Sequence, residues 1–226
     1  MSDSDSFIQE VNEEVRRDRL YGYLWRYGWI AVLFIVLVVG AAGFNEYRRA
    51  QATAQAEALG DAMLAGLSID DDEGRAAALA AAQADTPQGA AILAFMTAGV
   101  QTEAGETEAA VETLNGVSLN PDIPLIYRQV ATFKALTLQS DTLDAEARRA
   151  AFESLAVPGV SLRVLAEEQL ALIDIETGNT DAAIERFRMI MDDAEATTGL
   201  QRRALQAIVA LGGALTVDGT ADTPDE

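Results

Sequence analysis

The most apolar stretch of the chain lies near its N-terminus. Residues 28–44 form a run of 17 positions without a charge, most of them Val, Leu, Ile, Phe, Ala or Gly. A helix rises about 1.5 Å per residue, so this stretch covers roughly 26 Å, close to the ~30 Å hydrocarbon core of a bilayer. Aromatic residues, which favour the headgroup layer, gather at its N-terminal edge: Tyr21, Tyr23, Trp25, Tyr27 and Trp29. The pattern predicts a transmembrane helix over residues 28–44.

The arginines around this stretch predict its orientation. Four precede it and two follow it: Arg16, Arg17, Arg19 and Arg26, then Arg48 and Arg49. Positive charge favours the cytoplasmic side, so we expect residues 1–27 in the cytoplasm and residues 45–226 outside. A cleaved signal peptide is the alternative, because Ala41 and Gly43 are spaced like a cleavage site. The long acidic segment before the apolar run, and the length of that run, favour an uncleaved anchor.

Beyond the apolar stretch the pattern stays helical. Alanine is the commonest residue, at 42 of 226 positions, and Val, Ile and Thr seldom alternate with polar residues, so a β-rich fold is disfavoured. Residues 45–67 are rich in alanine and hold no proline, which predicts that the apolar helix continues outward. We therefore predict an all-α chain.

Turn and cap residues divide the remaining chain into helices. The acidic run of residues 68–74 predicts a helix over Arg75–Ala84, because carboxylates are stable beside a helix N-terminus. Thr86 followed by Pro87 predicts another helix start. A last helix is expected over Gln201–Leu211 and a glycine pair follows it, with its Arg202 and Arg203 face outward. The short polar terminus, residues 216–226, is expected to be disordered.

An internal repeat is the most informative feature of this region. Residues 103–114 match residues 176–187 at an offset of 73 residues, which is two units of 36–37 residues. A degenerate middle unit fills the gap, with Thr142 where the other two units have a glycine. The repeated positions are the glycines Gly105 and Gly178, the alanines Ala98, Ala110, Ala135, Ala147, Ala171 and Ala183, and the larger residues Leu114 and Phe187. Periods of this length indicate stacked supersecondary units.

The repeated residue types have physical reasons. Glycine accepts the left-handed conformation that ends a helix, so Gly105 and Gly178 are predicted turns between paired helices. The alanines allow the paired helices to approach closely, while Leu114 and Phe187 fill the space between units. Since one helix pair cannot bury its apolar face alone, at least three must stack.

The spacing of glycine, alanine and a leucine or aromatic residue resembles a tetratricopeptide repeat. The early Trp and mid-helix Tyr of that repeat are absent, and the last unit has Glu167 and Asp174 there, the first Ala94 and Gln101. The resemblance implies a tetratricopeptide-like helical solenoid over residues 45–215.

The order of segments resembles a bacterial family. It runs from an acidic and arginine-bearing N-terminus (Asp18-Arg19-Leu20), through an aromatic-edged span (Trp25 to Trp29) and an alanine-rich helix (Ala50 to Ala65), to divergent repeats. It is similar to the YfgM-type ancillary subunits of the SecYEG translocon. The resemblance implies an inner-membrane anchor, a periplasmic repeat domain, and association with the translocon, a periplasmic prolyl isomerase and chaperones.

Composition removes much catalytic chemistry. The chain has no His and no Cys, which excludes Ser-His-Asp triads, thiolate nucleophiles and zinc sites built on these residues. The formal net charge of −20 argues against nucleic-acid binding. Carboxylates adjacent in sequence point in different directions on a helix, so Glu167/Glu168 and Asp192/Asp193 are predicted to be solvated charges rather than a hydrolase pair. No metal, cofactor or catalytic residue is predicted.

The remaining prediction is protein binding. Stacked helix pairs commonly bind proteins on a concave face. Candidate residues for this groove are Phe95, Met96, Tyr127, Phe133 and Met189, and Phe187 is a further candidate for groove or core. Apolar residues at helical spacing more often pack in the core, so core packing is the alternative for each of them. We predict a non-enzymatic, membrane-tethered interaction module, likened above to a translocon subunit. One alternative is an envelope scaffold for cell-division or wall-synthesis proteins. Another is a carboxylate-dependent hydrolase, which the missing His, Cys and metal motifs disfavour.

Overall fold

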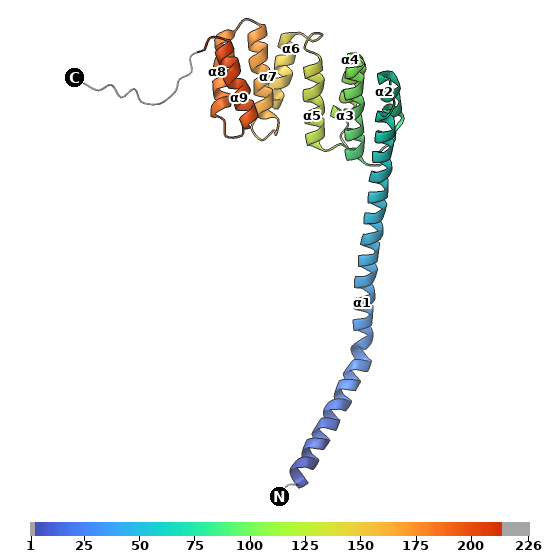
Figure 1. Cartoon of the computed structure of the whole chain (residues 1–226). Coiled ribbons are helices and arrows are strands. Elements are labelled where there is room, and N and C mark those ends of the chain that lie inside the picture. The colour runs from blue at the N-terminus through green and yellow to red at the C-terminus, as the bar shows by residue number, and fades with distance from the viewer. Residues whose placement is uncertain (1–2, 214–226) are drawn as a thin grey trace, which may run out of the picture. The chain divides into compact units, whose positions relative to one another are not determined.

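The computed structural model describes residues 3–213, with side chains at residues 25, 28–30 and 32–213. These residues form helices joined by turns and contain no strand, which confirms the all-α prediction (Figure 1). The helices are α1 (Asp3–Leu67), α2 (Asp72–Ala81), α3 (Pro87–Glu103), α4 (Thr107–Ser118), α5 (Leu125–Leu138), α6 (Ala145–Leu155), α7 (Arg163–Glu176), α8 (Thr180–Asp192) and α9 (Thr198–Ala210). The predicted tail, residues 216–226, and the side chains of Tyr21, Tyr23 and Tyr27 lie outside the described residues.

The first compact unit, Met1–Ala58, holds most of α1. The helix is continuous from the apolar stretch through residue 67, which confirms the predicted helical continuation. One part of it, within Gly28–Leu67, is long and apolar enough to cross a membrane. Each side chain from Val32 to Val39 is at least half exposed, so no protein surface covers this apolar stretch within the structure. The chain therefore has one candidate membrane-spanning helix among its described residues.

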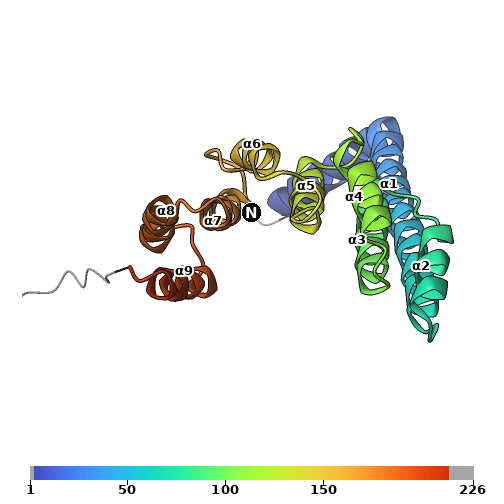
Figure 2. The same ribbon diagram turned by 90° about the horizontal axis from the view of Figure 1, so that it is seen from above.

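The second compact unit begins at Leu59, within the last turns of α1. Each helix from α2 to α9 packs on the next along the chain, as Figure 2 shows end on. The buried apolar residues form a series of clusters rather than one central core. The first joins α1, α2 and α3, the second α3, α4 and α5, the third α5, α6 and α7, and the last α7, α8 and α9.

The two glycine turns of the repeat have the same backbone geometry. Gly105 and Gly178 have φ angles of 79° and 78°, the left-handed region that the sequence predicts. In each turn the glycine N–H donates to the carbonyl three residues earlier, at Thr102 or Ile175, and the next residue donates five residues back. This pattern satisfies the last carbonyls of α3 and α7. The repeat in the sequence is therefore a repeat in the structure at these turns.

The repeated alanines and larger residues lie where the helices meet. Ala98, Ala110 and Leu114 share the second cluster with Ala135, and Ala171, Ala183 and Phe187 share the last. All seven are buried, with at most 3% of their surface exposed. Ala147, in α6, is half-buried.

The middle unit has a different turn. Gln139, Thr142 and Leu143 lie in a longer connection from α5 to α6, in which the N–H groups of Thr142 and Leu143 both donate to the Gln139 carbonyl. Asp144 then caps α6 by accepting the Ala147 N–H at 2.9 Å. In this unit a longer connection and the Asp144 cap of α6 therefore replace the glycine turn of the other two units.

Two predicted helix boundaries were wrong. The helix expected over Arg75–Ala84 begins at Asp72, because Asp71 accepts the Gly74 N–H and caps α2 within the acidic run, and it ends at Ala81. The last helix begins at Thr198 rather than Gln201, since Thr197 accepts the Leu200 N–H. In both cases a side-chain cap starts the helix earlier than the apolar pattern indicates. The start of α3 at Pro87, capped by Thr86, is as predicted.

Candidate functional site

A hollow of about 400 Å³ lies between α3 and α5, over α4. We call it the α3–α5 groove. Two of the predicted groove residues, Phe95 and Phe133, line it from opposite helices. Its other lining residues are Ala98, Gly99, Thr102 and Glu103 of α3, Leu114 of α4, and Lys134, Thr137 and Leu138 of α5. Its volume lies within the range of ligand pockets.

The aromatic side chains of the groove are held by neighbouring rings. Phe95 packs against Tyr127, with ring centroids 6.4 Å apart, and Phe133 makes an edge contact with Phe152 at 5.5 Å. Phe152 is fully buried, whereas Phe95, Tyr127 and Phe133 remain half-buried. Rings fixed on one side and open on the other give a preformed apolar surface.

The hydroxyl groups of the groove are already paired within their own helices. Thr102 Oγ1 donates to the Ala98 carbonyl at 2.7 Å, and Thr137 Oγ1 donates to the Phe133 carbonyl at 2.9 Å. Their hydroxyl protons are therefore not available to an occupant, although each hydroxyl oxygen can still accept a hydrogen bond.

Charged side chains stand at the edge of the groove and beyond it. Glu103 and Lys134 are exposed on opposite helices of the lining, and Lys134 is the one lysine of the whole sequence. A separate hollow of about 680 Å³ lies at the α3–α4 turn, and Gly105, Glu106, Thr107, Glu108, Ala109, Val111, Gln139 and Thr142 line it. The C-terminal ends of α3 and α5 thus lead from an apolar hollow to an acidic one.

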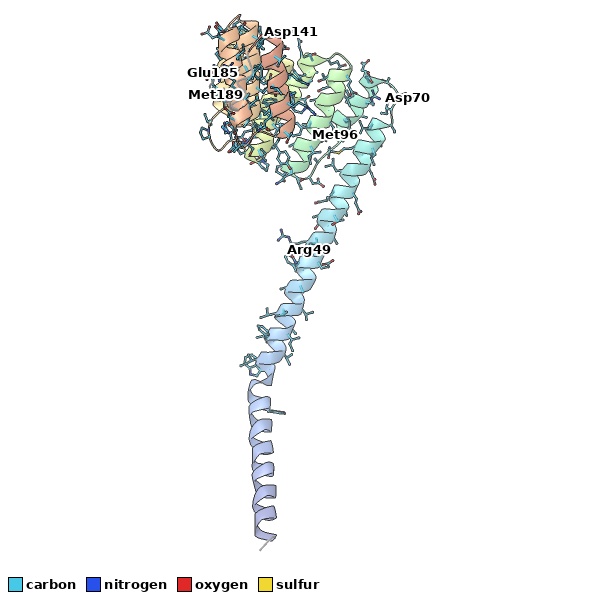
Figure 3. The ribbon with its side chains drawn as sticks, turned by 60° about the vertical axis from the view of Figure 1, so that its left-hand side comes forward. Arg49, Asp70, Met96, Asp141, Glu185 and Met189 are labelled. Carbon is cyan, nitrogen blue, oxygen red and sulfur yellow. The ribbon has the colours of Figure 1, made fainter. Side chains whose placement is uncertain are left out.

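The structure does not bring the other predicted groove residues here. Met96 is half-buried against the first cluster, near Leu79 and Leu93. Met189 is 54% exposed on α8, where Figure 3 shows it beside Glu185 and on a different helix from Met96. Phe187 is a core residue with 1% of its surface exposed. The groove is therefore formed by Phe95 and Phe133, with Tyr127 supporting Phe95.

Ion pairs around α7 correct the prediction of solvated carboxylates. Glu167 pairs with Arg186 of α8, and Glu168 pairs with Arg203 of α9 at 2.7 Å. Adjacent carboxylates do point in different directions, as predicted, but each reaches an arginine of a neighbouring helix. Arg203 consequently contacts α7 instead of only facing outward. Sequence spacing gave no signal for these contacts, because their partners are 19 and 35 residues away.

Asp174 is the most buried carboxylate of this network, with 5% of its side chain exposed. It forms an ion pair with Arg149 of α6 at 2.7 Å and accepts a hydrogen bond from Arg186 of α8 at 3.2 Å. Burial lowers the pKa of the Arg186 guanidinium, but its hydrogen bonds to Glu167 and Asp174 outweigh that effect and raise the pKa. These ion pairs join α7 to α6 and α8.

A second ion cluster joins the start of α7 to the end of α8. Arg163 Nη2 lies 2.7 Å from carboxylate oxygens of both Asp193 and Glu195. The Glu195 backbone N–H and then the Arg163 guanidinium hold the pKa of Asp193 below its ordinary value. Asp193, predicted to be solvated, is thus part of a structural contact, whereas Asp192 is exposed.

Among the residues with described side chains, no group of three or more Asp, Glu, His or Cys is placed to hold a metal ion. No protein-family model, no curated protein and no solved structure matches the chain. The α3–α5 groove is the site on which a function can be argued.

Proposed function

We propose that this chain is a non-enzymatic protein-interaction module tethered to the bacterial inner membrane, with residues 1–27 in the cytoplasm and residues 45–226 in the periplasm. One transmembrane helix, residues 28–44, supplies the location, and a tetratricopeptide-like array of helix pairs supplies the docking surface. The observation that carries the proposal is the α3–α5 groove, whose Phe95 and Phe133 rings are preformed and accessible.

The tether explains how a shallow groove becomes effective. A hollow with few hydrogen-bonding groups gives modest affinity on its own. Confinement to the membrane raises the local concentration of any partner that is also membrane-bound, which strengthens binding without new contacts. The partners that we propose are the SecYEG translocon together with a periplasmic prolyl isomerase or chaperones.

Site-specific photo-crosslinking in cells tests this function with the full chain. A photoreactive amino acid replaces Thr102 or Thr137, which are exposed on the two walls of the groove. The matched control is Glu185, exposed on α8. We expect translocon subunits or a periplasmic isomerase to crosslink from the groove positions and not from the control. Equal crosslinking from all three positions would contradict docking in the groove.

The same experiment separates the translocon role from the alternative. An envelope scaffold would crosslink from the groove to cell-division or wall-synthesis proteins. A reporter that is active only outside the cytoplasm, fused after Glu226, tests the orientation. Activity from a cytoplasm-specific reporter at that place would exclude both periplasmic roles.

A further inference from the structure

We propose that the α3–α5 groove selects an extended segment of a partner protein in which basic side chains lie next to one large apolar side chain. This inference rests on the proposed function and adds the chemistry of the segment. The apolar side chain occupies the hollow between Phe95 and Phe133, and the basic side chains lie over the acidic hollow beyond it.

The apolar half of the site is set by the groove lining. The buried residues Ala98 and Leu114 line the hollow together with the half-buried Phe95 and Phe133, and the threonine hydroxyls donate within their own helices. A polar side chain placed there would lose hydration and could bond only to the threonine oxygens or to the charged groups of Glu103 and Lys134, whereas an aromatic or aliphatic side chain would gain contacts with the apolar lining.

The charged half of the site has more carboxylates than cations. Glu103, Glu106 and Glu108 are exposed along the path from the groove to the second hollow, against the single cation of Lys134. The arginines that join helices elsewhere, such as Arg148, are engaged in ion pairs. The net charge of −20 also steers cationic segments towards the protein. Charge complementarity therefore favours a basic occupant.

Gly99 provides a second observation. It lies inside α3 and is exposed on the groove, and a Cβ added to it would meet no atom within 4 Å. Glycine is less favourable than alanine in the interior of a helix, and no close packing contact requires a glycine at position 99. Because Gly99 has no side chain, an occupant of the groove can approach the backbone of α3 at this position.

Peptide binding to the full-length protein in detergent micelles tests the inference. The probes are three fluorescently labelled peptides: one with a phenylalanine followed by lysines, a twin with glutamates for the lysines, and a twin with serine for the phenylalanine. Fluorescence anisotropy should show the first binding at least tenfold more tightly than either twin, with a Kd that rises with salt. Equal binding of the lysine and glutamate peptides, or tighter binding of the glutamate peptide, would overturn the proposed charge selection.

Variants of the groove test whether the lysine peptide binds there. Gly99→Leu fills the open wall and should weaken the lysine peptide at least tenfold, while Gly116→Leu, at an exposed glycine of α4 with the same free space, should leave binding unchanged. Replacing Glu103, Glu106 and Glu108 together by Gln should weaken binding, and Lys134→Gln should strengthen it. Circular dichroism melts of each variant confirm folding. If Gly99→Leu and Gly116→Leu behave alike, the peptide does not bind in the groove.

The two proposals fail differently. Loss of lysine selectivity together with groove crosslinks in cells would overturn the basic segment and leave the docking function standing. Lysine-peptide binding that is insensitive to Gly99→Leu, without groove crosslinks, would overturn both.

Discussion

Arg186 of α8 donates a hydrogen bond to the buried carboxylate of Asp174 of α7, with Nε and Oδ2 3.2 Å apart. The equivalent positions of the first repeat, 73 residues earlier, are Thr113 and Gln101, whose Oγ1 and Oε1 lie 2.9 Å apart. The same contact between paired helices thus persists while its chemistry changes from an uncharged hydrogen bond to an ion pair.

Asp174→Gln tests what the ion pair contributes. The substitution leaves Arg149 and Arg186 without their shared carboxylate, and we expect a loss of about 2–3 kcal/mol in the free energy of unfolding, less than for fully buried pairs since both arginines are partly exposed. Chemical denaturation of the full chain measures it. Glu185→Gln, at an exposed pair with Arg188, is the control and should cost less than about 0.5 kcal/mol.

A double variant tests whether the two repeats use one contact in two chemistries. Asp174→Gln with Arg186→Thr recreates the side chains of the first repeat. We expect the double variant to lose about 1–2 kcal/mol less than the sum of the two single variants, because each single variant already breaks the native ion pair and the new side chains can form a hydrogen bond. Strict additivity would show that the two contacts are not interchangeable.

Gly178→Ala tests the left-handed turn. At a φ of 78° an added Cβ crowds the backbone, although it meets no other atom within 4 Å, so we expect a loss of about 1–2 kcal/mol in the free energy of unfolding. Gly116→Ala has the same free space in the last turn of α4 and should stabilise the chain by about 0.5 kcal/mol. Opposite signs in denaturant melts would confirm the role of the backbone angle, and losses of equal size would contradict it.

Asp193→Asn tests the pH dependence of stability. The pKa of Asp193 is lowered in the folded chain, so its contribution is complete above its ordinary value of 3.8 and is lost as the pH falls through the lowered folded value. The variant should therefore be less stable than the parent near neutral pH, and the difference should shrink in acid. Thermal melts across this range measure it, with the exposed Asp192→Asn as control. A constant difference at every pH would assign the effect to packing instead of charge.

Deletion of residues 1–44 tests the membrane anchor. The remaining chain lacks the exposed apolar side chains of residues 32–39 and should leave the membrane fraction after alkaline carbonate extraction, whereas the full chain should stay in the pellet. Retention of the shortened chain would place a stable membrane contact elsewhere.

Much of the fold was predictable because its signals are local. The charge-free run of residues 28–44, the alanine-rich continuation, and the positions of Gly105 and Gly178 each depend on a few consecutive residues. Five of the six periodic alanines lie buried between helices, and the exception is Ala147 of the degenerate middle unit. The helix starts at Asp72 and Thr198 were missed because capping side chains there compete with the apolar pattern.

The candidate site was only partly predictable. Helical spacing identified Phe95, Tyr127, Phe133, Met96 and Met189 as equivalent apolar candidates. The tertiary structure gathered the first three and separated the two methionines, because packing between α3 and α5 decides which apolar side chains stay open. The sequence by itself determined an all-α chain with one apolar helix and a repeat of helix pairs, since those depend on local propensity and period. Only the tertiary structure decided that carboxylates of α7 pair with arginines of three other segments and that a groove opens beside Gly99, since both join residues far apart along the chain.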